Sequence, residues 1–179
     1  VDKGVLMKGG GTLTMTGVQI SGVKMGVEAT AGNLTINGHS TIMFNNGRDN
    51  YGVKVGSGVT LATLTDVTIA GSGQGMGVYG EGAKAVTLTN VGISGVDKGV
   101  LMKGGGTLTM TKVNISGVKM GVEAMGGNLT ISGNSVITFK NGNGNYGVRV
   151  GSGVTNATLT NVRIAGGGQG GCLWRVRRH

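Results

Sequence analysis

The sequence predicts an all-β protein: a right-handed, single-stranded parallel β-helix of about seven coils of 22–26 residues, with four coils in each 95-residue superrepeat. Three observations support this prediction: a recurring strand phrase, a regularly spaced Gly-Val pair and a long internal repeat. Coils of this length are typical of solenoids, in which each coil buries its apolar residues against its neighbours. The handedness follows from the general rule for crossovers between parallel strands and not from any particular residue.

The recurring strand phrase places apolar residues two positions apart, with a variable residue between them. Val18 and Ile20 form one such pair, and Val67 and Ile69 form another. This period predicts a strand with one buried face. The intervening residue differs in each copy, so we expect it to face water; the five examples are Gln19, Thr68, Gly92, Asn114 and Arg163.

The Gly-Val pair recurs at intervals of 22–26 residues, and each interval contains roughly three short apolar runs separated by Gly, Asn or Ser. Three runs per interval predict three strands in each coil. The pairs begin at Gly4, Gly26, Gly52, Gly77, Gly99, Gly121 and Gly147.

The internal repeat divides residues 1–170 into a superrepeat at 1–95 and a partial second superrepeat at 96–170. Residues 96–170 match residues 1–75 at 59 of 75 positions, and the differences fall mostly at polar or turn positions. The apolar positions are kept, so we expect a stacked core. Its members include Val18, Ile20, Leu64, Ile69, Leu88, Ile93 and Ile164.

The tail at 171–179 does not continue the repeat. The first superrepeat has Gly-Val-Tyr-Gly-Glu at the equivalent place, and a shifted reading of a DNA sequence for that peptide gives Cys-Leu-Trp-Arg, which is residues 172–175. The tail is therefore interpreted as the next coil translated out of frame. We expect its single Cys, its single Trp and its basic cluster to form neither a thiol site nor a nucleic-acid site.

Stacking in register brings residues from successive coils to about 4.8 Å from one another. The residues that directly follow the Gly-Val pairs are predicted to form one such ladder. It pairs Glu28 with Lys54 and Glu123 with Arg149, and each ion pair is worth about 0.2–1 kcal/mol. The predicted ladder runs through Leu6, Glu28, Lys54, Tyr79, Leu101, Glu123 and Arg149.

Basic residues outnumber acidic ones by 16 to 7, which gives a net charge of +9. Six lysines fall into two clusters, one in each superrepeat, about 19 Å apart along the stack. Such cations suit a sulfated polysaccharide or an acidic protein surface; a solvated face that keeps the rod soluble is the alternative interpretation. The candidate partner-binding residues are Lys3, Lys8, Lys24, Lys98, Lys103 and Lys119.

The sequence contains no recognisable group of catalytic, metal-binding or cofactor-binding residues. We therefore predict that the chain is not an enzyme. His39 is replaced by Asn134 in the second superrepeat, and the other histidine, His179, lies in the tail. No Ser-His-Asp arrangement therefore has a base within the repeats. The carboxylates are scattered, no Cys or His set has the spacing of a zinc site, and the apolar runs are too short for a membrane span.

The repeated sequence resembles the passenger domain of a bacterial type V autotransporter. The resemblance rests on the Gly-Val coil starts, the L-T-x-V-x-I-x-G strands and the near-perfect superrepeat over residues 1–170. The phrase VDKGVLMKGGGTLTMT is similar to the inducible, pro-angiogenic autotransporters of Bartonella. This resemblance implies a secreted or outer-membrane-displayed β-helix fragment that binds host cells and signals at an endothelial growth-factor receptor.

Two classes of function follow from the sequence. The first is a virulence-type protein that presents repeated surface features to a host receptor or sulfated glycan, with no nucleic-acid partner. The second is a carbohydrate-active β-helix enzyme, a polysaccharide lyase or hydrolase, whose active-site loops are missing. The repeated basic features favour the first class. An uncovered end coil would also leave strand edges that favour end-to-end self-association.

Overall fold

Residues 2–167 form a parallel β-helix in the computed structural model, and these are the residues that the structure describes. Fifteen strands are connected into one sheet, every pairing is parallel, and no helix occurs between residues 2 and 167. This confirms the predicted fold class. The tail at 171–179 and its out-of-frame interpretation lie outside the described residues.

Each coil contributes one segment to each of three faces. The first face contains β1 (Lys3–Met7), β7 (Met76–Glu81) and β9 (Lys98–Lys103). The second face contains β2 (Thr12–Thr16) and β10 (Thr107–Thr111). The third face contains β3 (Gln19–Val23), β5 (Ser40–Phe44), β11 (Asn114–Val118), β13 (Ser135–Phe139) and β15 (Val162–Gly166).

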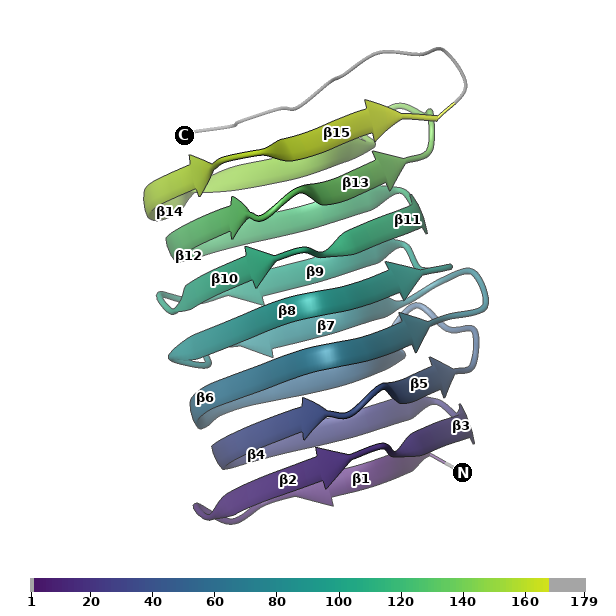
Figure 1. The fold of residues 1–179 in the computed structure, drawn as a ribbon, viewed down its shortest axis with the longest axis vertical. Helices are drawn as coiled ribbons and strands as arrows, with labels where there is room; N and C mark the ends of the chain where they lie inside the picture. Colours follow the sequence, from purple (N-terminus) through teal and green to yellow (C-terminus); the bar gives the residue numbers. More distant parts are fainter. Residues whose placement is uncertain (1, 168–179) are drawn as a thin grey trace.

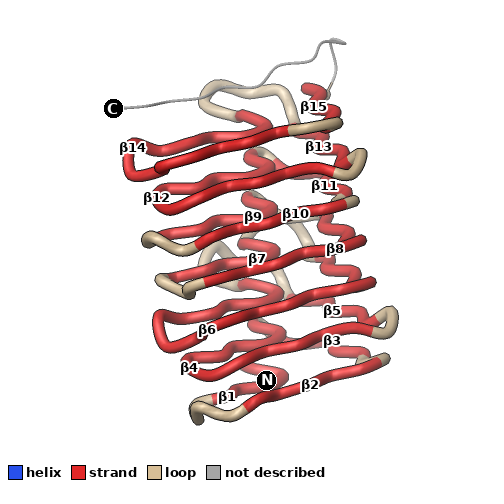
Figure 2. The backbone as a smooth tube through the Cα atoms, turned by 60° about the vertical axis from the view of Figure 1, so that its left-hand side comes forward, coloured by secondary structure: helices blue, strands red, loops and turns tan. Residues whose placement is uncertain are grey.

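The longer strands pass from one face to the next. Figure 1 shows the second and third faces in the front layer, with the first face behind them, and Figure 2 shows the same stack turned about its long axis. First and second faces are joined within β4 (Met25–Asn37), β12 (Met120–Ser132) and β14 (Tyr146–Leu159). Second and third faces are joined within β8 (Ala85–Ser94), and β6 (Tyr51–Ala70) continues through all three.

The core lies inside the coils and consists of stacked aliphatic side chains. Leu64, Ile69 and Leu88 have no exposed surface, and Ile93 and Ile164 are also buried, as the sequence predicted. Val18 and Ile20 are only half-buried. They belong to the first coil, where β3 pairs with β5 alone among residues 2–167 and no described coil covers the other side.

The glycine of each Gly-Val pair lies where the first face meets the third. A Cβ atom added to Gly77 would lie 2.5 Å from Cγ2 of Ile93 and 2.6 Å from the carbonyl oxygen of Gly99. The same contact joins Gly26 to Ile42 in another coil. The two sequence markers are therefore one packing feature, because the isoleucine of the strand phrase occupies the space that a side chain at this glycine would need.

A left-handed backbone residue marks the corner between the second and third faces in every coil. Gly17 has φ = 63° and its counterpart Lys112 has φ = 55°. Only glycine adopts this conformation without strain, although Asn and Asp tolerate it better than other residues. The corner therefore explains why many coils have Gly, Asn or Asp there: Gly17, Gly38, Asp66, Asn90, Gly133, Asn134 and Asn161 all have positive φ.

Candidate binding face

The outward side of the first face, here called the charged face, carries three rows of side chains. The first row contains residues that pair in register from coil to coil: Lys3, Met25, Tyr51, Met76, Lys98, Met120 and Tyr146. The second row is the predicted ladder, confirmed through Leu6, Glu28, Lys54, Tyr79, Leu101, Glu123 and Arg149. The third row, two residues further along each strand, contains Lys8, Thr30, Gly56, Glu81, Lys103, Met125 and Gly151.

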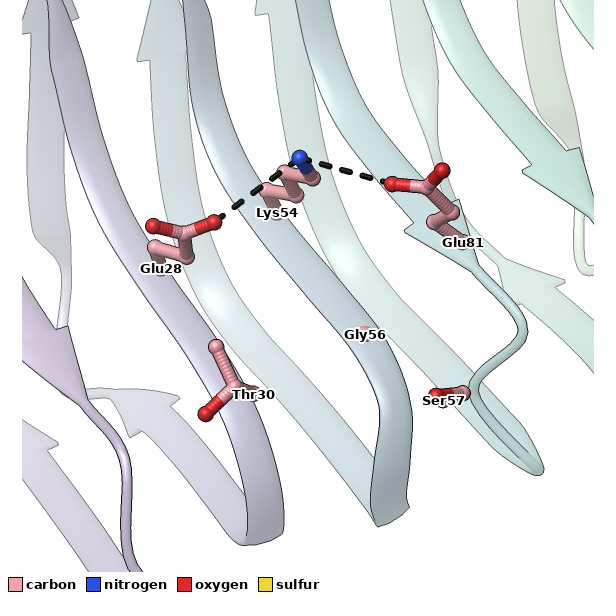
Figure 3. A pocket seen from close by; sticks show the side chains of 6 residues that line it. All are labelled: Glu28, Thr30, Lys54, Gly56, Ser57 and Glu81. Carbon is pink, nitrogen blue, oxygen red and sulfur yellow. Dashed lines mark ion pairs between the residues drawn. The ribbon is translucent and has the colours of Figure 1, made fainter.

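Lys54 is the centre of the first charged cluster, shown in Figure 3. Its Nζ atom lies 3.8 Å from Oε2 of Glu28 and 3.4 Å from Oε2 of Glu81, and both carboxylates point toward it. The same nitrogen lies 5.8 Å from the ring centroid of Tyr51 and 5.5 Å from that of Tyr79. Lys54 is therefore held by two carboxylates and two rings, an arrangement that favours one position of its ammonium group.

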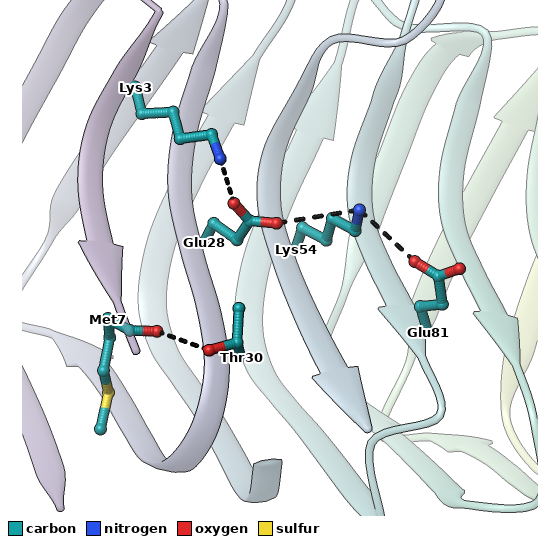
Figure 4. Close-up of polar contacts among 6 residues, drawn as sticks. All are labelled: Lys3, Met7, Glu28, Thr30, Lys54 and Glu81. Carbon is teal, nitrogen blue, oxygen red and sulfur yellow. Dashed lines mark hydrogen bonds and ion pairs between the residues drawn. The ribbon is translucent and has the colours of Figure 1, made fainter. Parts of the chain in front are cut away.

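A shallow depression of about 410 Å³ surrounds this cluster. The depression forms because small residues leave space there: Gly56 has no side chain, and the side chain of Ser57 is short (Figure 3). Thr30 forms another part of the wall and donates a hydrogen bond to the carbonyl oxygen of Met7, at 3.2 Å (Figure 4). The lining consists of Glu28, Thr30, Lys54, Gly56, Ser57 and Glu81.

The lysine of the first row extends this cluster by one more ion pair. Lys3 donates to Oε1 of Glu28, so that Glu28 lies between Lys3 and Lys54 (Figure 4). The sequence pattern predicts only the pair between Glu28 and Lys54, because Lys3 belongs to a different row of the face. The length of the lysine side chain allows the diagonal contact. The sequence does contain a signal for this contact, because lysine and glutamate are separated by the same 25 residues in both superrepeats.

The second superrepeat builds an equivalent cluster four coils further along. Nζ of Lys98 lies 3.0 Å from Oε1 of Glu123, and Nη1 of Arg149 lies 3.2 Å from Oε2 of the same residue. The side chain of Glu123 is only 7 % exposed. A buried carboxylate is costly without partners, but the side chains of Lys98 and Arg149 are 30 % and 37 % exposed, so solvent screens both ion pairs in part. Both predicted ion pairs are therefore present, and each glutamate also has a second cation.

The remaining predicted lysines divide into paired and unpaired residues. Lys24 lies 3.2 Å from Asp2 and Lys119 lies 3.5 Å from Asp97, measured from Nζ to Oδ1. These pairs precede the first-face strands of their coils. Lys8 and Lys103 are exposed and take part in no ion pair among residues 2–167. The ammonium of Lys103 lies 5.7 Å from the ring centroid of Tyr79.

Two tyrosines of the first row are buried beside the glutamates. Burial, and then the negative charge of Glu28, raise the pKa of Tyr51. Burial, and then the charge of Glu123, raise the pKa of Tyr146 to about 12. The hydroxyl of Tyr146 has Glu123 and Arg149 as neighbours but makes no hydrogen bond within the described structure. Both tyrosines therefore remain neutral at physiological pH.

The charged face is suited to recognition of a polar or charged surface. It combines the partly exposed ring of Tyr79, methionines and oriented charges, and aromatic residues and methionine are enriched at many interfaces. No group of three or more His, Cys, Asp or Glu side chains with metal-binding geometry occurs in the described range. No helix between residues 2 and 167 is long and apolar enough to cross a membrane.

A family model described as a right-handed β-helix region matches residues 98–178. This match confirms the predicted handedness, so the protein is a right-handed parallel β-helix of about seven coils. No curated protein and no solved structure matches the chain.

Proposed function

We propose that this chain is a passenger fragment of a bacterial autotransporter, secreted or displayed on the outer membrane, and that its charged face binds a host cell-surface component. The observation that carries the proposal is the placement of the six candidate lysines. All of them lie on the charged face or just before its strands, in two clusters related by the superrepeat. A β-helix serves many functions, so the proposal rests on this site and not on the fold.

The unpaired lysines are the main source of long-range attraction. Lys3, Lys24, Lys98 and Lys119 have acidic partners, which cancel most of their field at a distance. Lys8 and Lys103 are exposed, without ion pairs in the described range, and occupy equivalent places in the two superrepeats. We propose that these two lysines steer an acidic partner toward the face, while the paired residues give the face its shape.

The repetition of the cluster favours a partner with repeated or extended acidic features. Four coils separate the two clusters, which corresponds to about 19 Å along the axis. A ligand that reaches both clusters gains affinity through its high effective concentration at the second one. A sulfated glycan chain and an acidic receptor surface both meet this requirement, and an endothelial growth-factor receptor is the specific candidate that the resemblance implies.

The test is charge reversal at the two unpaired lysines. We expect Lys8→Glu combined with Lys103→Glu to slow association with endothelial-cell membranes and with heparin, and to reduce the dependence of binding on salt. The matched control is Lys112→Glu combined with Arg163→Glu, which changes the net charge equally but lies away from the charged face. Equal effects of the two double variants would show that net charge, and not this face, controls binding.

A second candidate function is carbohydrate-active catalysis, and the depression around Lys54 is the observation that favours it. Glu28 and Glu81 both face this hollow, and many glycosidases use two carboxylates. Against this role, Lys54 is ion-paired to both carboxylates and lies between them. Degradation of an acidic polysaccharide by the parent, lost in Glu81→Gln, would replace the binding proposal with this one.

End-to-end self-association is a further part of the proposal. Within residues 2–167 the strands of both end coils pair along one edge only: β1 and β2 with β4 and β3 with β5 at one end, and β14 with β12 and β15 with β13 at the other. Open edges can pair with another chain. Sedimentation at increasing protein concentration is expected to show end-to-end oligomers, and a constant monomer mass would contradict this expectation.

A further inference from the structure

The second face presents an unbroken ladder of threonines to solvent. The register aligns one threonine from every coil, and in the inner coils its chain neighbours are buried apolar residues, as Val86 and Leu88 are for Thr87. The alternation of inward and outward side chains therefore fixes the outward direction of the threonines. The ladder runs through Thr14, Thr35, Thr63, Thr87, Thr109, Thr130 and Thr158.

Two parallel rows flank this ladder, and neither contains a charged side chain. One row contains Thr12, Asn33, Leu61, Ala85, Thr107, Asn128 and Asn156. The other contains Thr16, Asn37, Thr65, Thr89, Thr111 and Ser132. The described part of the second face is thus a neutral array of hydroxyl, amide and methyl groups, in contrast to the ion pairs of the charged face.

The array is regular in two directions. Successive coils place equivalent hydroxyls about 4.8 Å apart along the axis, and alternate residues of one strand lie about 6.6 Å apart across it. Threonine is restricted at χ1 because it is β-branched, so a packed ladder favours the same rotamer in each coil. Methyl and hydroxyl groups then repeat together, at spacings close to those at which oxygen atoms recur on the prism faces of hexagonal ice.

We propose that the second face is an ice-binding surface, with ice as its single intended ligand. An ice crystal is uncharged, flat and periodic, and it presents hydrogen-bond donors and acceptors at fixed spacing. The face matches it in charge, because Lys and Glu side chains are absent from the three rows, and in period, because the coils stack in register. The methyl groups hold water in the intervals between hydroxyl ladders, and that water continues the lattice of the crystal.

Other ligands fit this face less well. A polyanion requires cations, and the three rows contain none. Sugar rings commonly stack on aromatic side chains, and Tyr51, Tyr79 and Tyr146 all lie in the rows of the charged face. A protein partner usually covers large apolar or aromatic residues, whereas Leu61 is the one large apolar side chain in the three rows of the second face within residues 2–167.

The test places the same arginine on two neighbouring faces. Thr87→Arg interrupts the central ladder of the second face. Thr68→Arg is the matched control, because Thr68 points outward from the third face and its counterpart in the second superrepeat is already Arg163. Thr109→Arg serves as a second, independent interruption of the ladder. Circular dichroism verifies that all variants keep the parent fold.

Two measurements are made on slowly grown ice: the enrichment of protein in the frozen fraction and the inhibition of recrystallisation. The parent and Thr68→Arg are expected to enter the ice fraction and to keep crystals small, while Thr87→Arg and Thr109→Arg lose both effects. Exclusion of the folded parent from ice, equal loss in Thr68→Arg, or full activity in both ladder variants would overturn the proposal. Binding of the parent to a neutral polysaccharide, but not to ice, would also overturn it.

Discussion

The contact between Gly77 and Ile93 gives the sharpest stability prediction. In Gly77→Ala the new methyl carbon would lie 2.5 Å from Cγ2 of Ile93 and 2.6 Å from the carbonyl oxygen of Gly99. Carbon atoms in favourable contact lie about 3.5–4.0 Å apart, so the overlap with Cγ2 of Ile93 is about 1 Å, and the contact with the carbonyl oxygen is also too short for a Cβ atom. Neither neighbour moves easily, because Ile93 is β-branched and fully packed and the oxygen belongs to the backbone of the next coil.

Overpacking of this kind typically costs about 1–3 kcal/mol. The matched control is Gly92→Ala in the same strand as Ile93, where an added Cβ meets nothing within 4 Å. Glycine weakens a strand, so this control is expected to be neutral or to gain about 0.5–1 kcal/mol. Urea unfolding, followed by far-ultraviolet circular dichroism, measures both variants. Equal midpoints for Gly77→Ala and the parent would refute the explanation of the Gly-Val repeat.

Three other predictions concern the corner, the core and the buried tyrosines. Lys112→Gly is expected to raise the melting temperature, because a left-handed conformation costs a non-glycine residue about 1–2 kcal/mol. Ile69→Asp is expected to unfold the protein while Thr68→Asp is tolerated, since the first buries a charge and the second leaves it in water; similar melting curves would contradict the assignment of sides. Tyr146→Phe is expected to stabilise by about 1 kcal/mol, because it removes an unsatisfied buried hydroxyl. The pKa of Tyr146 is about 12 in the fold against 10.0 ordinarily, so the fold favours the neutral phenol over the phenolate. The stability that depends on the neutral phenol is therefore complete below pH 10 and is lost as the pH rises toward 12. Tyr146→Phe should remove this loss from the pH dependence of melting.

The fold was predictable because the same local pattern recurs in every coil. The Gly-Val spacing alone fixed which residues stack, and so it placed Glu28 beside Lys54 and Glu123 beside Arg149 correctly. The interior was also predictable from the period of two. The exception is the first coil, where Ile20 is half-buried because burial depends on a neighbouring coil as well as on the pattern.

The charged face was predictable only in part. Sequence spacing identified the lysine clusters, but it did not show that Lys3 and Lys98 reach diagonally to glutamates of the next coil. Such contacts depend on side-chain length and rotamer, which a strand pattern does not specify. The positive φ of Lys112 was equally hidden, since only the comparison with Gly17 hinted at a special backbone at that corner.

The whole fold depends on the register of the coils, and disulfide trapping on the second face measures this register directly. With Cys172 replaced by serine, Thr35→Cys and Thr63→Cys place two thiols on adjacent, in-register coils, about 4.8 Å apart between strands and within the range of a disulfide. Thr35→Cys with Thr87→Cys places them two coils apart, about 9.6 Å by the same spacing and beyond that range. We expect rapid intramolecular oxidation of the first pair, with no loss of folded structure, and no oxidation of the second pair. Preferential cross-linking of the second pair, or unfolding when the first pair closes, would contradict the stacked β-helix.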